Sequence, residues 1–471
     1  MELHDVFVAP APLARFEKLV TPSRWHEVQA AAQAARRLLG NRVVWNVNST
    51  ASGGGVAEML QVLVGYALGI GVDMRWTVLQ GDAEFFAITK RIHNFLHGSS
   101  GDSGPLGAPE RRHYDKVLAG NAAALVSRVA RGDVVILHDP QTAGLVDALR
   151  DNGAIVIWRC HVGADEADSR VLQAWDVLRP YLQGAAAYVF SRAQFVPSSL
   201  DPLRVQVIPP SIDPFSPKNE ELDEDVVSSI LVHAGIARGD ARVEPTFIRR
   251  DGTSGRVVNE CQVVRADGPI DPDVPAIVQV SRWDRLKDMI GVLRGFAEHV
   301  AAEQAILVLV GPDVSGVSDD PEGHAVLEEC IAAWRDLPIS TRHRVHLVSV
   351  PMNDTEENAA IVNAIQRHAG VVVQKSLAEG FGLTVLEAMW KARPVVASAV
   401  GGIQDQIIDG EHGALLAHPH DLRAMGDAVD RLLDSPGEAA RLGARAKQRV
   451  REDFLGDRHL IQWVNLLEKL G

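Results

Sequence analysis

Short apolar runs alternate along most of the chain with longer stretches whose apolar residues recur at helical spacing. The runs are rich in Val and Ile and nearly continuous, which is the pattern of parallel strands buried on both faces. They cover residues 41–49, 133–139, 154–161, 186–192 and 205–211 in the first half, and 276–283, 305–312, 343–351, 370–376 and 393–402 in the second. Helical patterns lie between them, for example at 355–368 and 421–434. This alternation predicts an α/β protein with parallel sheets.

A stretch rich in proline and acidic residues at 208–225 interrupts the alternation and marks a domain boundary. We therefore predict two doubly wound, Rossmann-like domains at 1–212 and 213–450, and a C-terminal helix at 451–471 that could pack back on the N-terminal domain. Paired domains of this kind bind ligands at the carboxyl ends of their strands, so the site is expected in a cleft between them. The polar, glycine-rich segment 236–275 is either a small strand insertion or a mobile loop.

Composition narrows the class of protein. The formal net charge of the 471 residues is -14, which disfavours a nucleic-acid partner, because such proteins usually carry a basic face. Cys160, Cys261 and Cys330 are far apart and form no C-x-x-C pair, so neither a disulfide framework nor a structural zinc site is expected. The N-terminus lacks a signal-peptide pattern, and the apolar run 59–72 is too short to span a membrane. We expect a cytoplasmic protein without a membrane partner.

A glycine-rich turn follows the first long strand, in the sequence NSTASGGGVAE at 48–58. Gly53, Gly54 and Gly55 would let backbone N–H groups approach a ligand, and the helix that follows favours negative charge at its start. The turn matches neither the nucleoside-triphosphatase loop nor the dinucleotide fingerprint. It is therefore either a phosphate or sugar contact or an ordinary tight turn.

Two cations follow a strand in the second half, in VSRWDRLKDM at 280–289. Arg282 and Lys287 lie where a parallel strand ends and a helix begins, and two cations there can neutralise a diphosphate. The same spacing also occurs in solvated charged loops, so this motif by itself decides little.

Two glutamates frame the stretch SLAEGFGLTVLEAMW at 376–390. Glu379 lies in a turn and Glu387 lies eight positions later in a predicted helix, whose start is exposed by Gly380 and Gly382. Eight helical residues rise about 12 Å, whereas carboxylate pairs that cleave glycosides lie roughly 5–5.5 Å or 6.5–9.5 Å apart. The spacing therefore favours two separate contacts on one extended ligand, such as a sugar–diphosphate–ribose molecule, and disfavours a glycosidase.

A histidine ends a strand of the first half, in WRCHVG at 158–163. A lone histidine is usually a satisfied core or surface residue, but the position of His161 at a strand end makes a functional role equally plausible. Asp82, in QGDAEFF, is a weaker candidate.

Taken together, E-G-F-G-L-x-x-x-E preceded by Arg282 and Lys287 resembles the retaining nucleotide-sugar glycosyltransferases of the two-domain GT-B fold. The segments WNVNSTASGGGVAEML, VIWRCH, VIPPSIDPFSPKN, QKSLAEGFGLTVLEAMWKARPVVAS and VGGIQDQI extend the match over nearly the whole chain, which resembles the glycosyltransferring trehalose synthase group. That group joins a nucleoside-diphospho-glucose to free glucose and gives α,α-trehalose. The resemblance departs at Arg285, where many relatives have proline, and at segment 236–275, which looks longer.

The resemblance implies a role for each motif. Arg282 and Lys287 would hold the diphosphate, and Glu387 would bind the ribose hydroxyls. Glu379 would bind the donor glucose, with the backbone of Gly380, Phe381, Gly382 and Leu383 beside it. Gly53, Gly54 and Gly55 would touch the donor phosphate or the acceptor, His161 would bind the donor sugar near its reacting carbon, and Asp82 would contact the acceptor.

The resemblance also implies the mechanism and the partners. Transfer would be retaining, with the departing diphosphate taking the acceptor's proton, which fits the lack of a convincing nucleophile. The nucleotide-sugar, ADP-glucose or UDP-glucose among them, would be a substrate and no tightly bound cofactor is expected. No metal cluster is visible, so magnesium would enter only with the nucleotide, and relatives suggest a homodimer. Alternatives are a trehalose phosphorylase, a GT-B transferase with another acceptor, a nucleotide-sugar epimerase and a nucleotide-sugar sensor without activity.

Overall fold

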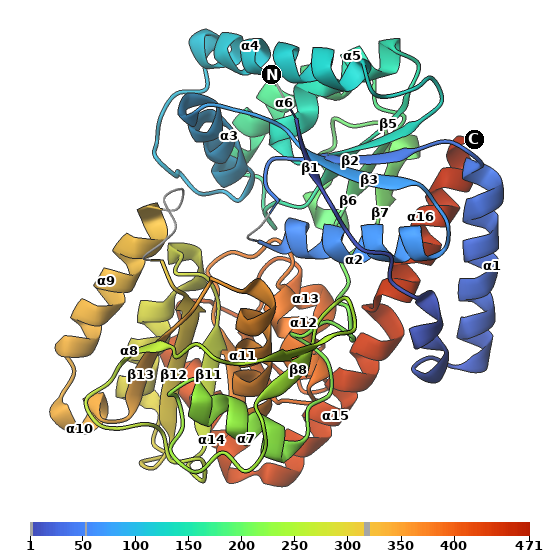
Figure 1. The fold of residues 1–471 in the computed structure, drawn as a ribbon. Coiled ribbons are helices and arrows are strands. Elements are labelled where there is room, and N and C mark those ends of the chain that lie inside the picture. The colour runs from blue at the N-terminus through green and yellow to red at the C-terminus, as the bar shows by residue number, and fades with distance from the viewer. Residues whose placement is uncertain (1–2, 52–53, 315–320) are drawn as a thin grey trace. The chain divides into compact units, whose positions relative to one another are not determined.

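A computed structural model describes residues 3–51, 54–314 and 321–471 (Figure 1). The chain divides into two compact units, residues 1–212 with 454–471 (unit 1) and residues 213–453 (unit 2). Each unit is built around one seven-stranded sheet with helices on both faces, so the predicted α/β class with two doubly wound domains is confirmed. In the described part of the chain, no helix is both long and apolar enough to cross a membrane.

The sheet of unit 1 is parallel except at one edge, where β1 runs antiparallel to β3. Its strands, in spatial order, are β1 (His4–Val6), β3 (Met74–Val78), β2 (Val44–Asn48), β4 (Val134–His138), β5 (Ile155–Cys160), β6 (Ala187–Phe190) and β7 (Val205–Val207). Its helices are α1 (Pro22–Leu39), α2 (Gly55–Gly69), α3 (Ala83–Leu96), α4 (Ala108–Val126), α5 (Val146–Asp151), α6 (Ser169–Leu182) and α16 (Gly456–Leu470), with short 3₁₀ turns η1 (Leu13–Lys18), η2 (Pro140–Leu145), η3 (Ala193–Phe195) and η4 (Pro202–Arg204).

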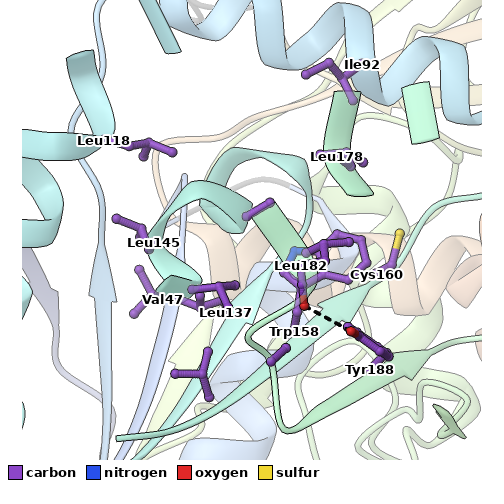
Figure 2. Close-up of a cluster of buried hydrophobic side chains, with 14 of the residues drawn as sticks. Val47, Ile92, Leu118, Leu137, Leu145, Trp158, Cys160, Leu178, Leu182 and Tyr188 are labelled. Atoms are coloured by element: carbon purple, nitrogen blue, oxygen red, sulfur yellow. Dashed lines mark hydrogen bonds between the residues drawn. The ribbon is translucent and has the colours of Figure 1, made fainter. Parts of the chain in front are cut away.

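The main core of unit 1 lies on the face of the sheet that α3, α4 and α6 cover (Figure 2). Strand residues such as Leu137 and Trp158 meet helix residues such as Ile92 and Leu178 there. The Tyr188 hydroxyl in this core donates to the Leu182 carbonyl oxygen at 3.0 Å. Because β4 is buried along its whole length, its apolar run is continuous and not alternating.

Unit 1 is completed by the last helix of the chain. Ile212 pairs with Leu455, and α16 packs beside α1. The Arg24 guanidinium on α1 donates to the fully buried Asp457 carboxylate at 2.8 Å. These contacts anchor residues 454–471 on the N-terminal unit.

Unit 2 repeats the plan, with β10 antiparallel to β13 at one edge. Its strands, in spatial order, are β10 (Gln262–Val264), β13 (Val345–Val350), β12 (Ile306–Pro312), β11 (Ala276–Val280), β14 (Val371–Gln374), β15 (Val395–Ser398) and β16 (Ala414–Leu416). Its helices are α7 (Glu224–His233), α8 (Met289–His299), α9 (Pro321–Arg335), α10 (Ile339–Arg342), α11 (Thr355–His368), α12 (Leu383–Trp390), α13 (Ile403–Gln406), α14 (Leu422–Asp434) and α15 (Pro436–Asp453), with the 3₁₀ turn η5 (Arg285–Lys287).

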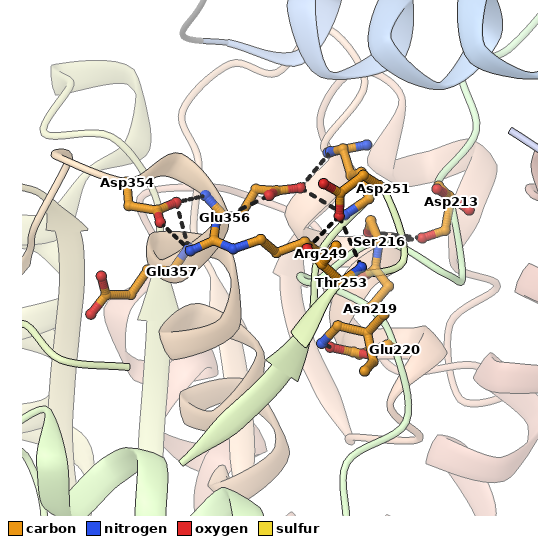
Figure 3. Close-up of polar contacts among 12 residues, drawn as sticks. Asp213, Ser216, Asn219, Glu220, Arg249, Asp251, Thr253, Asp354, Glu356 and Glu357 are labelled. Carbon is orange, nitrogen blue, oxygen red and sulfur yellow. Dashed lines mark hydrogen bonds and ion pairs between the residues drawn. The ribbon is translucent and has the colours of Figure 1, made fainter. Parts of the chain in front are cut away.

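Segment 236–275, which the sequence left open, contains strand structure. It holds β10 and a hairpin of β8 (Thr246–Ile248) and β9 (Ser254–Arg256). Figure 3 shows Arg249 of the hairpin reaching the start of α11, where it pairs with Asp354 at 2.6 Å and Glu356 at 3.2 Å. The segment is therefore a small strand insertion fixed to unit 2.

Candidate functional site

The two predicted cations of unit 2 lie in the loop after β11, but they have different surroundings. Arg282 is about half exposed and its guanidinium pairs with Asp284 at 3.2 Å. Lys287 ends η5, which the Asp284 carboxylate caps by accepting from the Leu286 N–H at 2.8 Å. The capped turn thus fixes the backbone of Lys287, whereas the Arg282 side chain remains partly exposed to solvent.

Lys287 and Glu379 form a direct ion pair. The Lys287 Nζ atom lies 2.6 Å from Glu379 Oε2, and both side chains are mostly buried, with 15% and 11% of their areas exposed. The Ser376 hydroxyl also donates to Glu379 Oε2, at 3.4 Å. The structure therefore joins the cationic loop and the E-G-F-G-L stretch, which are 92 positions apart in the sequence.

The turn between Glu379 and α12 is packed against a second glycine pair. Gly382 has a left-handed backbone with φ +90° and precedes the first residue of α12, Leu383. Gly401 and Gly402 approach this turn so closely that a Cβ on Gly401 would lie 1.6 Å from the Glu379 carbonyl oxygen, and one on Gly402 would lie 2.7 Å from the Phe381 Cα. The Gln406 side-chain amide donates to the Phe381 carbonyl at 2.5 Å. The backbone from Glu379 to Leu383, including Gly380, is thus held in place by contacts with Gly401, Gly402 and Gln406.

Glu387 has partners that differ from those of Glu379. It lies in α12, is 2% exposed, and its Oε1 atom is 3.7 Å from the Lys218 ammonium. Lys391, one turn later, donates to the Glu387 carbonyl and to Asn219 Oδ1, each at 3.2 Å. Burial lowers the pKa of Lys391 below its ordinary value, although the negative charge of Glu387 acts in the opposite direction.

These two lysines were not among the site residues predicted from the sequence. Lys218 lies in the SPKN stretch, which contributed to the resemblance but had no assigned role. Lys391 lies four residues after Glu387 on a helix, a spacing that places two side chains on one face and could have drawn attention to it.

His161 of unit 1 belongs to a chain of polar side chains that runs from the end of β5 through His138 at the end of β4 to Asn46 in the middle of β2. Its Nε2 atom lies 3.0 Å from His138 Nδ1, the two rings are stacked, and His138 Nε2 lies 3.1 Å from Asn46 Oδ1. Burial, with a smaller contribution from the Arg159 cation, lowers the pKa of both histidines well below the ordinary value. Both rings are therefore neutral at neutral pH.

Asp139, also missed by sequence analysis, directly follows β4 and supports His161. It has a left-handed backbone with φ +63°, uncommon for a residue other than glycine, and its Oδ1 atom accepts from the His161 N–H at 2.7 Å. Burial raises the pKa of Asp139 to about 7, against the opposing effects of that hydrogen bond and of Arg159. An aspartate directly after a buried strand was the signal available in the sequence.

The raised pKa of Asp139 predicts a pH-dependent stability. Because the native state holds this proton up to about pH 7 and the unfolded state releases it near 3.8, stability falls as pH rises through that window. The slope is at most about 1.4 kcal/mol per pH unit. Asp139→Asn cannot ionise, so its Tm should rise relative to wild type between pH 4 and pH 7 and then stay level.

Thermal unfolding at several pH values measures this difference. Asp151→Asn is the matched control, since it removes an exposed carboxylate of the same unit, with 69% of the side-chain area accessible. A Tm difference for Asp139→Asn that stays constant from pH 4 to pH 8 would contradict the prediction.

The remaining predicted residues of unit 1 are not joined to His161 by the described contacts. Gly53 lies outside the described residues, Gly54 has φ +85° and precedes α2, and Gly55 begins that helix. The Asp82 carboxylate caps α3 by accepting from the Phe85 N–H at 2.8 Å and pairs with His113 at 2.8 Å. Those two contacts give Asp82 a structural role. Among the described residues, no group of three or more His, Cys, Asp or Glu side chains could hold a metal ion.

A chain with two doubly wound units of this kind is typical of GT-B glycosyltransferases. Among solved structures, the chain is similar to sucrose-phosphate synthase from Thermosynechococcus elongatus, at TM-score 0.63 and 18% identity over 91% of this chain and 99% of that one. It is also similar to OtsA, at TM-score 0.65 and 14% identity over 91% of this chain and 99% of that one. Identities this low bear on the fold only.

Sequence relatives define the family. Residues 46–197 match the trehalose synthase N-terminal domain, and residues 262–449 match the group 1 glycosyl transferases. The chain is 35% identical to trehalose synthase of Pyrococcus horikoshii, over 94% of each chain, and 35% identical to that of Rubrobacter xylanophilus, over 97% of each. The chain therefore belongs to the trehalose synthase family, and the family resemblance is confirmed. Trehalose phosphorylase of Pleurotus sajor-caju is more distant, at 24% identity over 78% of this chain and 50% of that one.

Proposed function

We propose that this glycosyltransferase moves glucose from a nucleoside-diphospho-glucose to free glucose and forms α,α-trehalose with retention of configuration. The observation that carries the proposal is the Lys287–Glu379 ion pair at the strand ends of unit 2, in a chain of the trehalose synthase family. One partner suits a phosphate and the other suits sugar hydroxyls. The pair thus fits the junction between the sugar and the diphosphate of the donor.

The proposed chemistry needs no protein nucleophile. The acceptor hydroxyl forms a bond to C1 of the donor glucose on the face from which the diphosphate departs, and the departing phosphate oxygen takes the hydroxyl proton. Lys287, aided by Arg282, stabilises the charge that develops on the diphosphate. Glu379 holds hydroxyls of the donor glucose, and Glu387 holds the ribose.

The neutral state of His161 suits its proposed contact with the donor sugar. A neutral imidazole can hydrogen-bond a hydroxyl without placing a positive charge beside the reacting carbon, where positive charge develops as the bond to the diphosphate breaks. Asp139 supports this contact by holding the backbone of His161.

Product analysis tests the proposal. The protein is incubated with glucose and, in separate tubes, UDP-, ADP- or GDP-glucose, and another tube holds trehalose and inorganic phosphate. We expect a non-reducing disaccharide and one equivalent of nucleoside diphosphate, and the effective tube identifies the base. Tubes without the glucose acceptor are controls for donor hydrolysis.

The outcomes separate the candidate functions. Glucose 1-phosphate that appears only in the phosphate tube would overturn the proposal in favour of a phosphorylase. A nucleotide-sugar that binds but yields no disaccharide would overturn the acceptor assignment.

A further inference from the structure

Lys375 is a buried lysine directly after β14 that none of the proposed roles uses. Its side chain is fully buried, its Nζ atom pairs with the Asp288 carboxylate, and it donates to the Pro419 carbonyl at 2.6 Å. Taking two charges out of water is costly, and a well-packed apolar pair of similar size is often as stable. Stability alone therefore does not account for this ion pair.

The partner of Lys375 is the residue directly after Lys287. Asp288 has a left-handed backbone, with φ +48°, and its Oδ1 atom caps α8 by accepting from the Gly291 N–H at 3.1 Å. A left-handed backbone at a residue other than glycine is strained, and it persists only where the surrounding structure imposes it. The ion pair with Lys375 holds the Asp288 side chain in place. It thereby also fixes the turn that ends at Lys287.

Neighbouring hydrogen bonds fix the same turn. The Leu286 carbonyl accepts from the Leu377 N–H at 2.7 Å, and the Lys287 carbonyl accepts from the buried Gln279 side chain at 2.7 Å. Gln279 accepts in turn from the Lys375 N–H at 3.2 Å. The backbone at 286–288 is thus tied to the segment that continues to Glu379.

We propose that the Lys375–Asp288 ion pair positions Lys287. By fixing the turn, the pair orients the Lys287 ammonium group toward the leaving diphosphate. This inference rests on the proposed function, because only in that function does Lys287 stabilise the charge that develops on a leaving diphosphate. Lys375 touches no reacting atom in this scheme and acts only through the turn. Loss of the pair should therefore lower kcat more than it weakens nucleotide binding, since orientation matters most where charge develops.

The test is the double variant Lys375→Met with Asp288→Asn. Methionine keeps the apolar stem of the lysine, while asparagine tolerates a left-handed backbone and can still cap α8. We expect kcat to fall by about tenfold to hundredfold, the range that a misplaced catalytic group costs. The rate is expressed per binding site, with sites titrated by whichever of UDP, ADP or GDP the wild type releases, so that misfolded protein does not count.

The matched control is Arg24→Met with Asp457→Asn, which removes the ion pair of a buried aspartate in unit 1 by likewise replacing the cation with methionine and the aspartate with asparagine. This control should lower Tm and leave kcat per site within about twofold. A second test repeats the Lys375→Met, Asp288→Asn change in a Lys287→Ala background. If the pair acts through Lys287, the change should there have almost no further effect on kcat, because coupled residues are not additive.

Two results would overturn this inference and leave the proposed function standing. The first is a wild-type kcat per site in the double variant, and the second is an equally large loss of kcat when the same change is made in the Lys287→Ala background. If the double variant does not fold, Asp288→Asn alone, which keeps the cap and weakens the ion pair, must still lower kcat per site by severalfold. A wild type that transfers no glucose from any nucleotide would instead overturn the proposed function, and with it the role of Lys287 on which the positioning role depends.

Discussion

Lys287→Ala should lower kcat by about 10²–10³, with a much smaller effect on Tm. The ammonium group is proposed to stabilise charge that appears on the diphosphate only as the glycosidic bond breaks, so its loss affects the transition state more than the ground state. Arg282→Ala should act in the same direction and more weakly, because Arg282 is half exposed and paired with Asp284. Steady-state kinetics of disaccharide formation, with Tm measured on the same samples, provide the comparison.

The chain offers a matched control in the same turn. Arg285 is also a cation of η5, but its guanidinium is half exposed and pairs with Glu322 and Glu329 of α9. Arg285→Ala should therefore leave kcat near the wild-type value. Near-normal turnover in both Lys287→Ala and Arg282→Ala would show that the phosphate site has been assigned to the wrong residues.

Gly401→Ala should remove most activity and lower stability as well. Its backbone has φ +50°, and a Cβ would lie 1.6 Å from the Glu379 carbonyl oxygen, so the turn that carries Glu379 must move. Backbone strain and overpacking together should cost about 2–5 kcal/mol. A displacement of about 1 Å at Glu379 would lower kcat by roughly 10²-fold. Kinetics and thermal unfolding of the variant measure both effects.

Alanine substitutions at two other glycines separate the backbone strain from the overpacking expected for Gly401→Ala. Gly410 has φ +70° with open space around it, so Gly410→Ala should cost only the backbone strain, about 1–2 kcal/mol. Gly437 lies in α15, also with open space, and Gly437→Ala should be neutral or slightly stabilising. If Gly401→Ala retains normal kcat, the glycine pair does not control the position of Glu379.

Contacts within one motif could be predicted from the sequence, because local patterns determine them. The apolar runs correspond to strands of both sheets, and α11 covers the predicted residues Thr355–His368. The cap at Asp82 is also a local feature, because an aspartate directly before a helical pattern is typical of an N-cap. The structure places the Asp82 carboxylate in that role, whereas the resemblance implied a contact with the acceptor.

Contacts between distant segments could not be predicted in the same way. The buried pair of Lys375 and Asp288 is 87 positions apart, and each residue alone is an unremarkable charge in the sequence. Lys287 and Glu379 were both singled out, but nothing local showed that their side chains would touch. Asp139 owes its raised pKa to burial by the surrounding fold, which a single sequence does not report.

The pairing of Ile212 with Leu455 has a consequence for the order in which the chain can fold during synthesis. Unit 1 consists of two segments separated by the whole of unit 2, so its sheet is made long before α16 emerges from the ribosome. At ordinary rates of translation the delay is on the order of tens of seconds. Unit 2 is synthesised during that delay, and its core is complete only once α15, which contributes Leu442, has been made directly before α16. The surface of unit 1 that awaits α16, including the buried Arg159 that contacts His459, stays exposed in the nascent chain until synthesis reaches the last helix.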